Sequence, residues 1–236
     1  SDVKAWTARG GADEACKAAG QATALEGAAY TEFASVMRLV GHVETAVNAL
    51  ARVDAGYRFV RDGTYPFRGL GIGIPTLVEV LSRYTGVPVI VEMKVDTLDM
   101  GRATAEAVRA AGAVDTACVA GFGRFSALGA RTALPDVAAS ACTRETRLAL
   151  YRSWVRWPVR RVAYQTYQVP EFAGATRVVS PRFIASAHAA SLRVQVWTVD
   201  EDADMRRLLG WGVDALITNR PDLAVRVRDE ACGRPT

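Results

Sequence analysis

The sequence predicts an α/β protein whose strands form a parallel sheet. From about residue 76 onward, short apolar runs rich in β-branched residues alternate with amphipathic helical segments. Residues 87–91 read Val-Pro-Val-Ile-Val, a continuous apolar run of the kind found in strands that are covered on both faces. Alternating strands and helices of this kind belong to parallel sheets, because each helix carries the chain back to start the next strand.

The strands are expected where β-branched or small apolar residues run together between turn signals. Six segments meet this description: residues 87–92, 117–120, 137–141, 161–165, 193–198 and 215–218.

Helix boundaries follow from capping residues and breakers. Thr76 follows Pro75 and is a suitable N-cap, Gly112 and Gly212 are C-terminal stops, and Pro181 suits a first helical turn. The predicted helices are residues 76–84, 101–111, 124–133, 143–155, 181–191 and 201–211, with a closing helix from Pro221.

An open doubly wound sheet and a closed barrel both fit this alternation. A glycine-rich phosphate loop directly after the first strand would favour the open sheet, and none occurs. Gly69, Gly71 and Gly73 precede a helix but follow no strand, so they are expected to be loop glycines.

Composition narrows the class of protein. The chain has 236 residues, half of them hydrophobic, and a formal net charge of +4. This length suits one large α/β domain or two small ones. No run of about 18 apolar residues predicts a membrane-spanning helix. The first eleven residues resemble neither a signal peptide nor an anchor, so a cytoplasmic location is favoured.

The cysteines and arginines indicate no special cofactor. Four cysteines stand far apart without a CxxC pair, which argues against a zinc site, and Cys118 and Cys142 are expected in the core. The densest arginines lie within residues 144–161. They form either a solvated helix face or a surface that attracts phosphate or anionic lipid headgroups. Nucleic-acid binding is disfavoured, because basic and aromatic residues do not alternate as on a strand-binding platform.

Polar residues stand where the predicted strands end, which is where a barrel carries its chemistry. Glu92 and Lys94 occupy alternate positions and therefore point to the same side of one strand. They form either a structural ion pair or a metal ligand beside a phosphate-binding cation. Polar residues are also expected at the ends of later strands: Gln165, Trp197 with Thr198, and Thr218 with Asn219.

Four motifs in order and at matching spacing resemble the glycerophosphodiester phosphodiesterase family. Residues 74–81 look like the helix before its third strand, and Glu92 with Lys94 looks like its E-x-K strand end. Residues 196–200 look like its W-T-V-[ND] strand end, and residues 212–221 look like its closing G-V-D-x-[IL]-x-T-[DN]-x-P motif.

The resemblance implies a TIM-type (β/α)8 barrel that cleaves glycerophosphodiesters to sn-glycerol 3-phosphate and an alcohol with a divalent cation. It makes Glu92 a metal ligand, Lys94 the catalytic lysine that also binds the substrate phosphate, and Trp197 the aromatic on the glycerol side. Oxygen ligands suit Mg²⁺ or Ca²⁺.

The amino-terminal part departs from the family. The H-R-G, E-N-T and H-D motifs are missing, and the two histidines are His42, which no aspartate follows, and His188 in a predicted outer helix. Either residues 8–10 are a degraded H-R-G, or Asp2 is the aspartate of the E-x-D motif and a second metal ligand; the spacing favours Asp2. We expect an alanine-rich helical segment at 1–50, the barrel at 51–230 and a tail at 231–236, with the barrel incomplete at its amino-terminal strands.

Two functions from different classes follow from these motifs. One is a phosphodiesterase that is weakly active because its acid–base groups are missing and its divalent cation is weakly held. The other is a non-catalytic barrel domain that binds phosphate or a headgroup. An unrelated barrel enzyme is a third reading.

Overall fold

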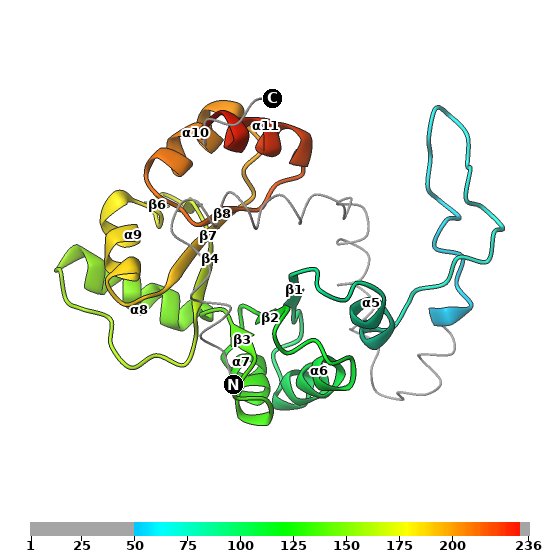
Figure 1. Cartoon of the computed structure of the whole chain (residues 1–236), viewed down its shortest axis with the longest axis horizontal. Coiled ribbons are helices and arrows are strands. Elements are labelled where there is room, and N and C mark those ends of the chain that lie inside the picture. The colour runs from blue at the N-terminus through cyan, green and yellow to red at the C-terminus, as the bar shows by residue number, and fades with distance from the viewer. Residues whose placement is uncertain (1–49, 232–236) are drawn as a thin grey trace.

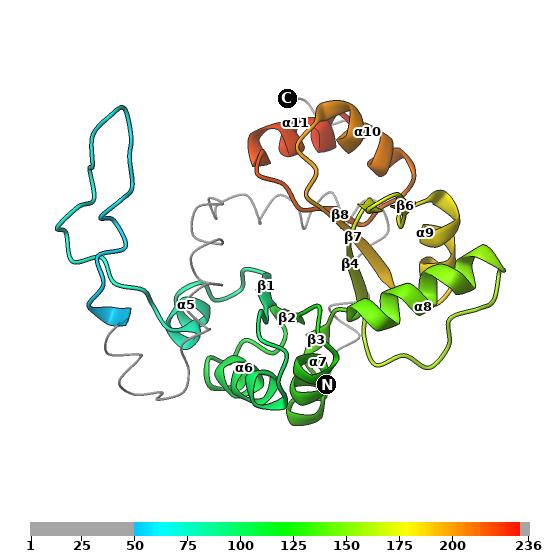
Figure 2. The same cartoon turned by 180° about the vertical axis from the view of Figure 1, so that it is seen from behind.

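A computed structural model describes residues 50–231 of the chain, and the predictions that concern residues 1–49 and 232–236 lie outside it. The described part is an α/β structure with parallel strands and seven helices (Figures 1 and 2). None of these helices is long and apolar enough to cross a membrane.

Six parallel strands follow one another in chain order. The strands β1 (Val89–Glu92), β2 (Ala117–Ala120) and β3 (Ala138–Ala139) form one sheet, and β4 (Thr166–Pro170), β7 (Arg193–Trp197) and β8 (Ala215–Leu216) form another. A parallel bridge between Ser140 and Thr166 joins the two sheets.

This sequential order favours a barrel over a doubly wound sheet. In a doubly wound sheet the first strand lies inside and the order reverses around it. Here each parallel strand pairs with the one before it in the chain, which confirms the predicted order within the described residues. Closure of the ring would require a connection between β1 and β8, either directly or through further strands, and the described residues do not make one.

Seven helices lie on the outside of the strands (Figure 1). They are α5 (Leu77–Arg83), α6 (Leu98–Ala110), α7 (Arg124–Ala133), α8 (Thr143–Trp154), α9 (Pro181–His188), α10 (Asp202–Gly210) and α11 (Pro221–Ala231). Thr76 caps α5 in a capping box with Glu79, and Pro181 opens α9, as predicted.

Two of the predictions about the strands were wrong. Residues 161–165 are not a strand, because Arg161 has a left-handed backbone with φ of 51° that interrupts extended geometry. The strand begins later, at Thr166, so Gln165 precedes it rather than ending it. An antiparallel hairpin of β5 (Phe172–Ala173) and β6 (Thr176–Arg177), which was not predicted, follows β4.

Two apolar clusters fill the space between the strands and the helices. The first contains Met93, Val108 and Val119, and the second contains Tyr167, Phe183 and Val194, all of which are buried. Cys118 and Cys142 are buried free thiols, as predicted. Burial raises the pKa of Cys118 to about 12, so this thiol remains protonated and unreactive.

Helices α6 and α7 approach each other through glycines. A Cβ atom on Gly129 would collide with the backbone of Leu98, and one on Gly101 would collide with the backbone of Ser126 and Ala130. Only residues without a side chain allow the two helices to pack this closely.

We therefore predict that Gly129→Val lowers the free energy of unfolding by at least about 1–3 kcal/mol, because the backbone of α6 must move away. Thermal unfolding followed by circular dichroism measures the change. Gly210→Ala is the control, since a Cβ there meets no atom within 4 Å and alanine favours the helix. Equal melting temperatures for Gly129→Val and the unmodified chain would contradict the packing.

Candidate active site

The carboxyl ends of the strands carry the predicted site residues. Glu92 is the last residue of β1, and Trp197 is the last residue of β7. Met93 belongs to the first apolar cluster beneath the helices, Val89 packs against that cluster, and Val91 between them is buried. Because side chains alternate along an extended chain, Glu92 and Lys94 point to the opposite, inner side.

Glu92 and Lys94 form an ion pair, as their spacing suggested. The Lys94 Nζ donates to Glu92 Oε1 at 2.7 Å, and the side chains are 38% and 17% exposed for Lys94 and Glu92, respectively. The lysine is thus the more accessible partner, and it can present its remaining donors to an anion at the strand ends.

Trp197 contacts an aromatic residue that the sequence analysis missed. Phe122 follows β2, and its ring lies 5.8 Å from that of Trp197 in an edge-to-face arrangement. The strands β2 and β7 are three steps apart in the sheet, a span of about 14 Å if the sheet were flat. The sheet must therefore curve, which brings the ends of β2 and β7 together. We call this side of the molecule, where the strands end near Glu92, Phe122 and Trp197, the mouth.

A local signal for Phe122 does exist. This residue lies between Gly121 and Gly123 directly after an apolar strand, and residues in loops at strand ends are frequent binding residues. It is 54% exposed. Its carbonyl accepts from the Thr143 N–H at 3.1 Å, so the start of α8 holds the loop in place.

Aspartates fix the loops around this mouth. Asp96, shortly after Lys94, accepts hydrogen bonds from the Phe125 and Ser126 amides at 2.7 and 2.9 Å. It thereby caps the amino end of α7 from another loop. A Cβ on Gly123 would collide with Asp96, so the glycine gives the carboxylate its access to the helix end.

Asp200 joins two of the sequence motifs. Its carboxylate accepts from the Thr218 hydroxyl at 2.9 Å, from the Asn219 amide N–H at 2.8 Å and from the Asn219 side chain at 3.0 Å. Desolvation alone would raise the pKa of Asp200, but these hydrogen bonds outweigh it and lower the pKa. The loops after β7 and β8 are therefore held as one unit.

The histidine in the described chain lies away from this mouth. His188 ends α9, as expected of an outer helix, and its Nε2 lies 2.9 Å from Asp214 Oδ2. Asp214 also accepts from the Val194 N–H at 2.7 Å at the start of β7. This places His188 at the amino ends of the strands, where its contact with Asp214 helps to hold the turn before β7. His42 and Asp2 lie outside the described residues.

The described residues do not by themselves form a divalent cation site. No group of three or more histidine, cysteine, aspartate or glutamate side chains comes together among residues 50–231. Glu92 is one carboxylate, and Lys94 already neutralises it. A hard cation held by a single carboxylate keeps most of its water and binds weakly.

Fold and site together define a parallel-strand α/β protein with a cation and aromatics at the carboxyl ends of its strands. Residues 47–223 match the Glycerophosphoryl diester phosphodiesterase family. Since this match covers more than half of the chain, the protein belongs to that family.

One curated relative shares a short segment. It is the "Probable glycerophosphodiester phosphodiesterase 2" of Mycobacterium tuberculosis, 43% identical over 56 residues, which are 24% of this chain and 21% of the relative. The matched segment thus spans about a fifth of the relative's length.

Solved structures of similar fold include proteins named glycerophosphoryl diester phosphodiesterases. A glycerophosphoryl diester phosphodiesterase domain from Mycobacterium tuberculosis superposes with a TM-score of 0.62 at 16% identity, over 77% of this chain and 74% of that one. A putative enzyme from Silicibacter pomeroyi gives 0.55 at 23% identity, over 68% and 58%. An Oleispira antarctica phosphodiesterase in complex with the product sn-glycerol-3-phosphate gives 0.51 at 17%, over 77% and 70%.

From the Asp200 hydrogen bonds we predict that Asp200→Asn lowers the free energy of unfolding at pH 7 by about 1 kcal/mol. The lowered pKa of Asp200 means that its stabilisation is complete above the unfolded pKa of about 3.9 and is lost as pH falls through the lower folded value. Urea unfolding at pH 7 and pH 3 measures both effects. Asp99→Asn, on the exposed face of α6, is the control. An unchanged midpoint for Asp200→Asn at pH 7 would contradict this role.

Proposed function

We propose that this chain is a phosphoric diester hydrolase of lipid metabolism that cleaves glycerophosphodiesters to sn-glycerol 3-phosphate and an alcohol. Membership of the family supports the reaction class, and a structural neighbour is described with that product. The ion pair of Glu92 and Lys94 at the mouth, with Trp197 at the end of β7, is the observation that carries the proposal.

In this proposal Lys94 binds the substrate phosphate. Water attacks phosphorus, the phosphorus–oxygen bond to the alcohol breaks, and the alcohol oxygen leaves with a proton. Negative charge grows on the phosphoryl oxygens along this path, and a fixed ammonium group lowers its energy. Glu92 holds Lys94 in place at 2.7 Å before the substrate arrives.

Trp197 supplies an apolar wall for the glycerol part of the substrate. Its ring is held from one side by Phe122 at 5.8 Å, and it is only partly buried at the end of β7. An aromatic face in this position packs against the carbon chain of glycerol while leaving the hydroxyl groups in contact with water.

We also propose that Glu92 and Asp2 bind a divalent cation, Mg²⁺ or Ca²⁺, weakly. A second carboxylate would have to come from outside the described residues, and Asp2 is our candidate from the sequence. We likewise propose that residues before Val89 complete a closed (β/α)8 ring. The other partners that we expect are small molecules, not nucleic acid.

The rate is expected to be low. The family's paired histidines have no counterpart among residues 50–231, where His188 serves the β7 turn. General acid–base groups each contribute about 10²–10⁴-fold. A second candidate function, a non-catalytic domain that binds phosphate or a headgroup, is favoured by the same ion pair, since Lys94 neutralises the carboxylate that would hold the cation.

We predict slow release of sn-glycerol 3-phosphate from glycerophosphocholine by the full chain with millimolar Mg²⁺ or Ca²⁺. Lys94→Ala should lower kcat/KM by about 10²–10³-fold, because the transition-state charge loses its cation. Arg102→Ala is the control, since it removes an exposed ion pair with Asp99 on α6.

The outcomes separate the two functions. Binding of sn-glycerol 3-phosphate that depends on Lys94, without turnover of the diester, would establish the binding domain. Rapid turnover that Glu92→Ala abolishes would show that another group replaces the missing histidines, which would contradict the low rate that we expect.

For Trp197→Ala we predict a rise in KM of roughly threefold to tenfold with a smaller change in kcat, because a packing contact worth about 0.5–1.5 kcal/mol is lost in ground and transition states alike. Tyr84→Ala is the control, because Tyr84 is the C-cap of α5, at the other end of the strands. A fall in kcat with an unchanged KM would show that the ring does not bind the glycerol part.

A further inference from the structure

The outward face of α8 and the loop after it expose apolar side chains. Leu148, Tyr151 and Trp154 are each 50% exposed, and Val155 and Trp157 are 72% and 65% exposed. The opposite face of the helix packs inward through Ala149, Leu150 and Ser153. The two faces follow helical periodicity, so the exposed residues form a stripe that no other described element covers.

The same surface is strongly basic. Its seven arginines form no ion pair within 4 Å among the described residues: Arg144, Arg147, Arg152, Arg156, Arg160 and Arg161, together with Arg182 at the start of α9. Glu145 is the one acidic residue of segment 143–163, and Arg131 of α7 binds it in a bidentate pair at 2.8 and 3.0 Å.

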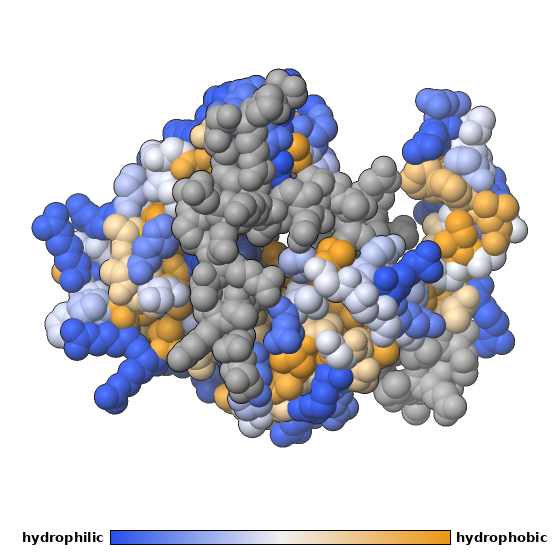
Figure 3. Space-filling model, in the orientation of Figure 1, coloured by the Kyte–Doolittle hydropathy of each residue, from blue (hydrophilic) through white to orange (hydrophobic). Residues whose placement is uncertain are grey.

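We call these arginines and the exposed apolar residues of α8 and its following loop the basic aromatic face. Arg206, Arg207 and Arg220, by contrast, are each paired with a carboxylate at 2.6–2.9 Å. In Figure 2, α8 lies at the front of the molecule, and in Figure 3 hydrophilic side chains project at the edge where the loop after α8 lies.

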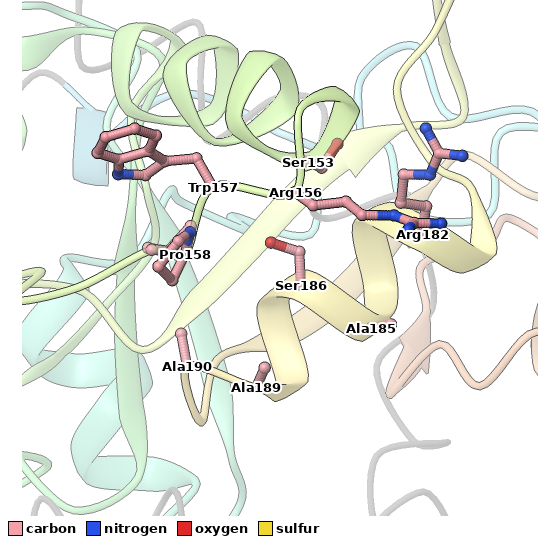
Figure 4. A pocket seen from close by; sticks show the side chains of 10 residues that line it. Ser153, Arg156, Trp157, Pro158, Arg182, Ala185, Ser186, Ala189 and Ala190 are labelled. Carbon is pink, nitrogen blue, oxygen red and sulfur yellow. The ribbon is translucent and has the colours of Figure 1, made fainter.

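A hollow lies within this face, between the end of α8 and α9. It has a volume of about 330 Å³, and its polar lining includes Ser153, Arg156, Arg182 and Ser186. Figure 4 shows the side chain of Arg156 extending across the hollow toward the start of α9, where the side chain of Arg182 begins. Arg182 also donates to the Trp154 carbonyl at 3.4 Å, which ties the hollow to the exposed tryptophan.

We propose that the basic aromatic face docks on an anionic phospholipid bilayer, with Arg156 and Arg182 receiving a headgroup phosphate. Exposed tryptophan and tyrosine rings favour the interface between headgroups and acyl chains, and arginines add attraction to anionic lipids. Both arginines line the same hollow, and guanidinium groups offer the planar donors that suit phosphate oxygens.

Other occupants fit the face less well. A symmetric dimer through this face would bring two sets of unpaired arginines together, which is unfavourable. Single-stranded nucleic acid prefers a groove with aromatic platforms, whereas these rings lie on the outer side of a helix. An anionic bilayer matches the face in both respects: its negative headgroups match the arginines, and its apolar interior accepts the exposed apolar side chains.

The position of the face fits a substrate that has no acyl chains. Helix α8 starts at Thr143, next to Phe122 at the mouth, and runs away from it to Trp154. The tryptophans therefore lie toward the end of the barrel opposite Glu92 and Lys94. A chain docked in this way leaves its mouth open to water, from which a glycerophosphodiester enters.

The test is sedimentation of the full chain with vesicles of phosphatidylcholine, with and without phosphatidylglycerol. We expect binding to the anionic vesicles that weakens by at least about tenfold when salt is raised from 0.1 to about 1 M. Arg156→Ala with Arg182→Ala should weaken it by roughly thirtyfold. Trp154→Ala with Trp157→Ala should weaken it by at least about tenfold.

Arg83→Ala with Arg102→Ala is the matched control, since both arginines lie on other helices and carry the same charge. Circular dichroism shows whether each variant is folded, and brominated lipid reports insertion by quenching tryptophan fluorescence in the unmodified chain. Equal binding to neutral and anionic vesicles would overturn the proposal, and so would a folded chain that binds neither. Dimerisation that the tryptophan substitutions abolish, or oligonucleotide binding without vesicle binding, would also overturn it.

Discussion

The continuity of hydrogen bonding from β3 to β4 is the constraint on which the rest of the structure depends. The Gln165 N–H donates to the Ala139 carbonyl at 2.9 Å, and the Ala141 N–H donates to the Thr166 carbonyl at 2.8 Å. Beside this joint Arg131 of α7 binds Glu145 of α8 and the Ser140 carbonyl. Without it the two three-stranded sheets would be separate bodies, and Phe122 could not meet Trp197 across the mouth.

Several aspartates at the ends of the strands hold loops and helix ends in place. Asp96 caps α7, Asp200 ties the loop after β7 to the loop after β8, and Asp214 binds both His188 and the start of β7. Two of these three lie in motifs that identify the family, so part of what a family motif preserves is the geometry of turns. In the proposed reaction the chemistry rests on fewer groups, chiefly Lys94 and Glu92, whose carboxylate accepts a hydrogen bond from it.

The sequence was sufficient where local rules decide the structure. Helix 124–133 and strand 117–120 match α7 and β2 residue for residue, because apolar periodicity and glycine or proline signals bound both of them. The pairing of Glu92 with Lys94 followed from strand alternation. The strand at 161–165 failed because the left-handed Arg161 has no local sequence signal. Phe122 was missed because its contact with Trp197 depends on sheet curvature, which arises only from the assembled strands.

The sequential strand order also leaves two edges. Within residues 50–231, β1 pairs only with β2 and β8 only with β7. The outer sides of both strands therefore present backbone donors and acceptors, and a free parallel edge is a template for pairing with another chain. The solubility of the protein therefore depends on how the outer sides of β1 and β8 are covered.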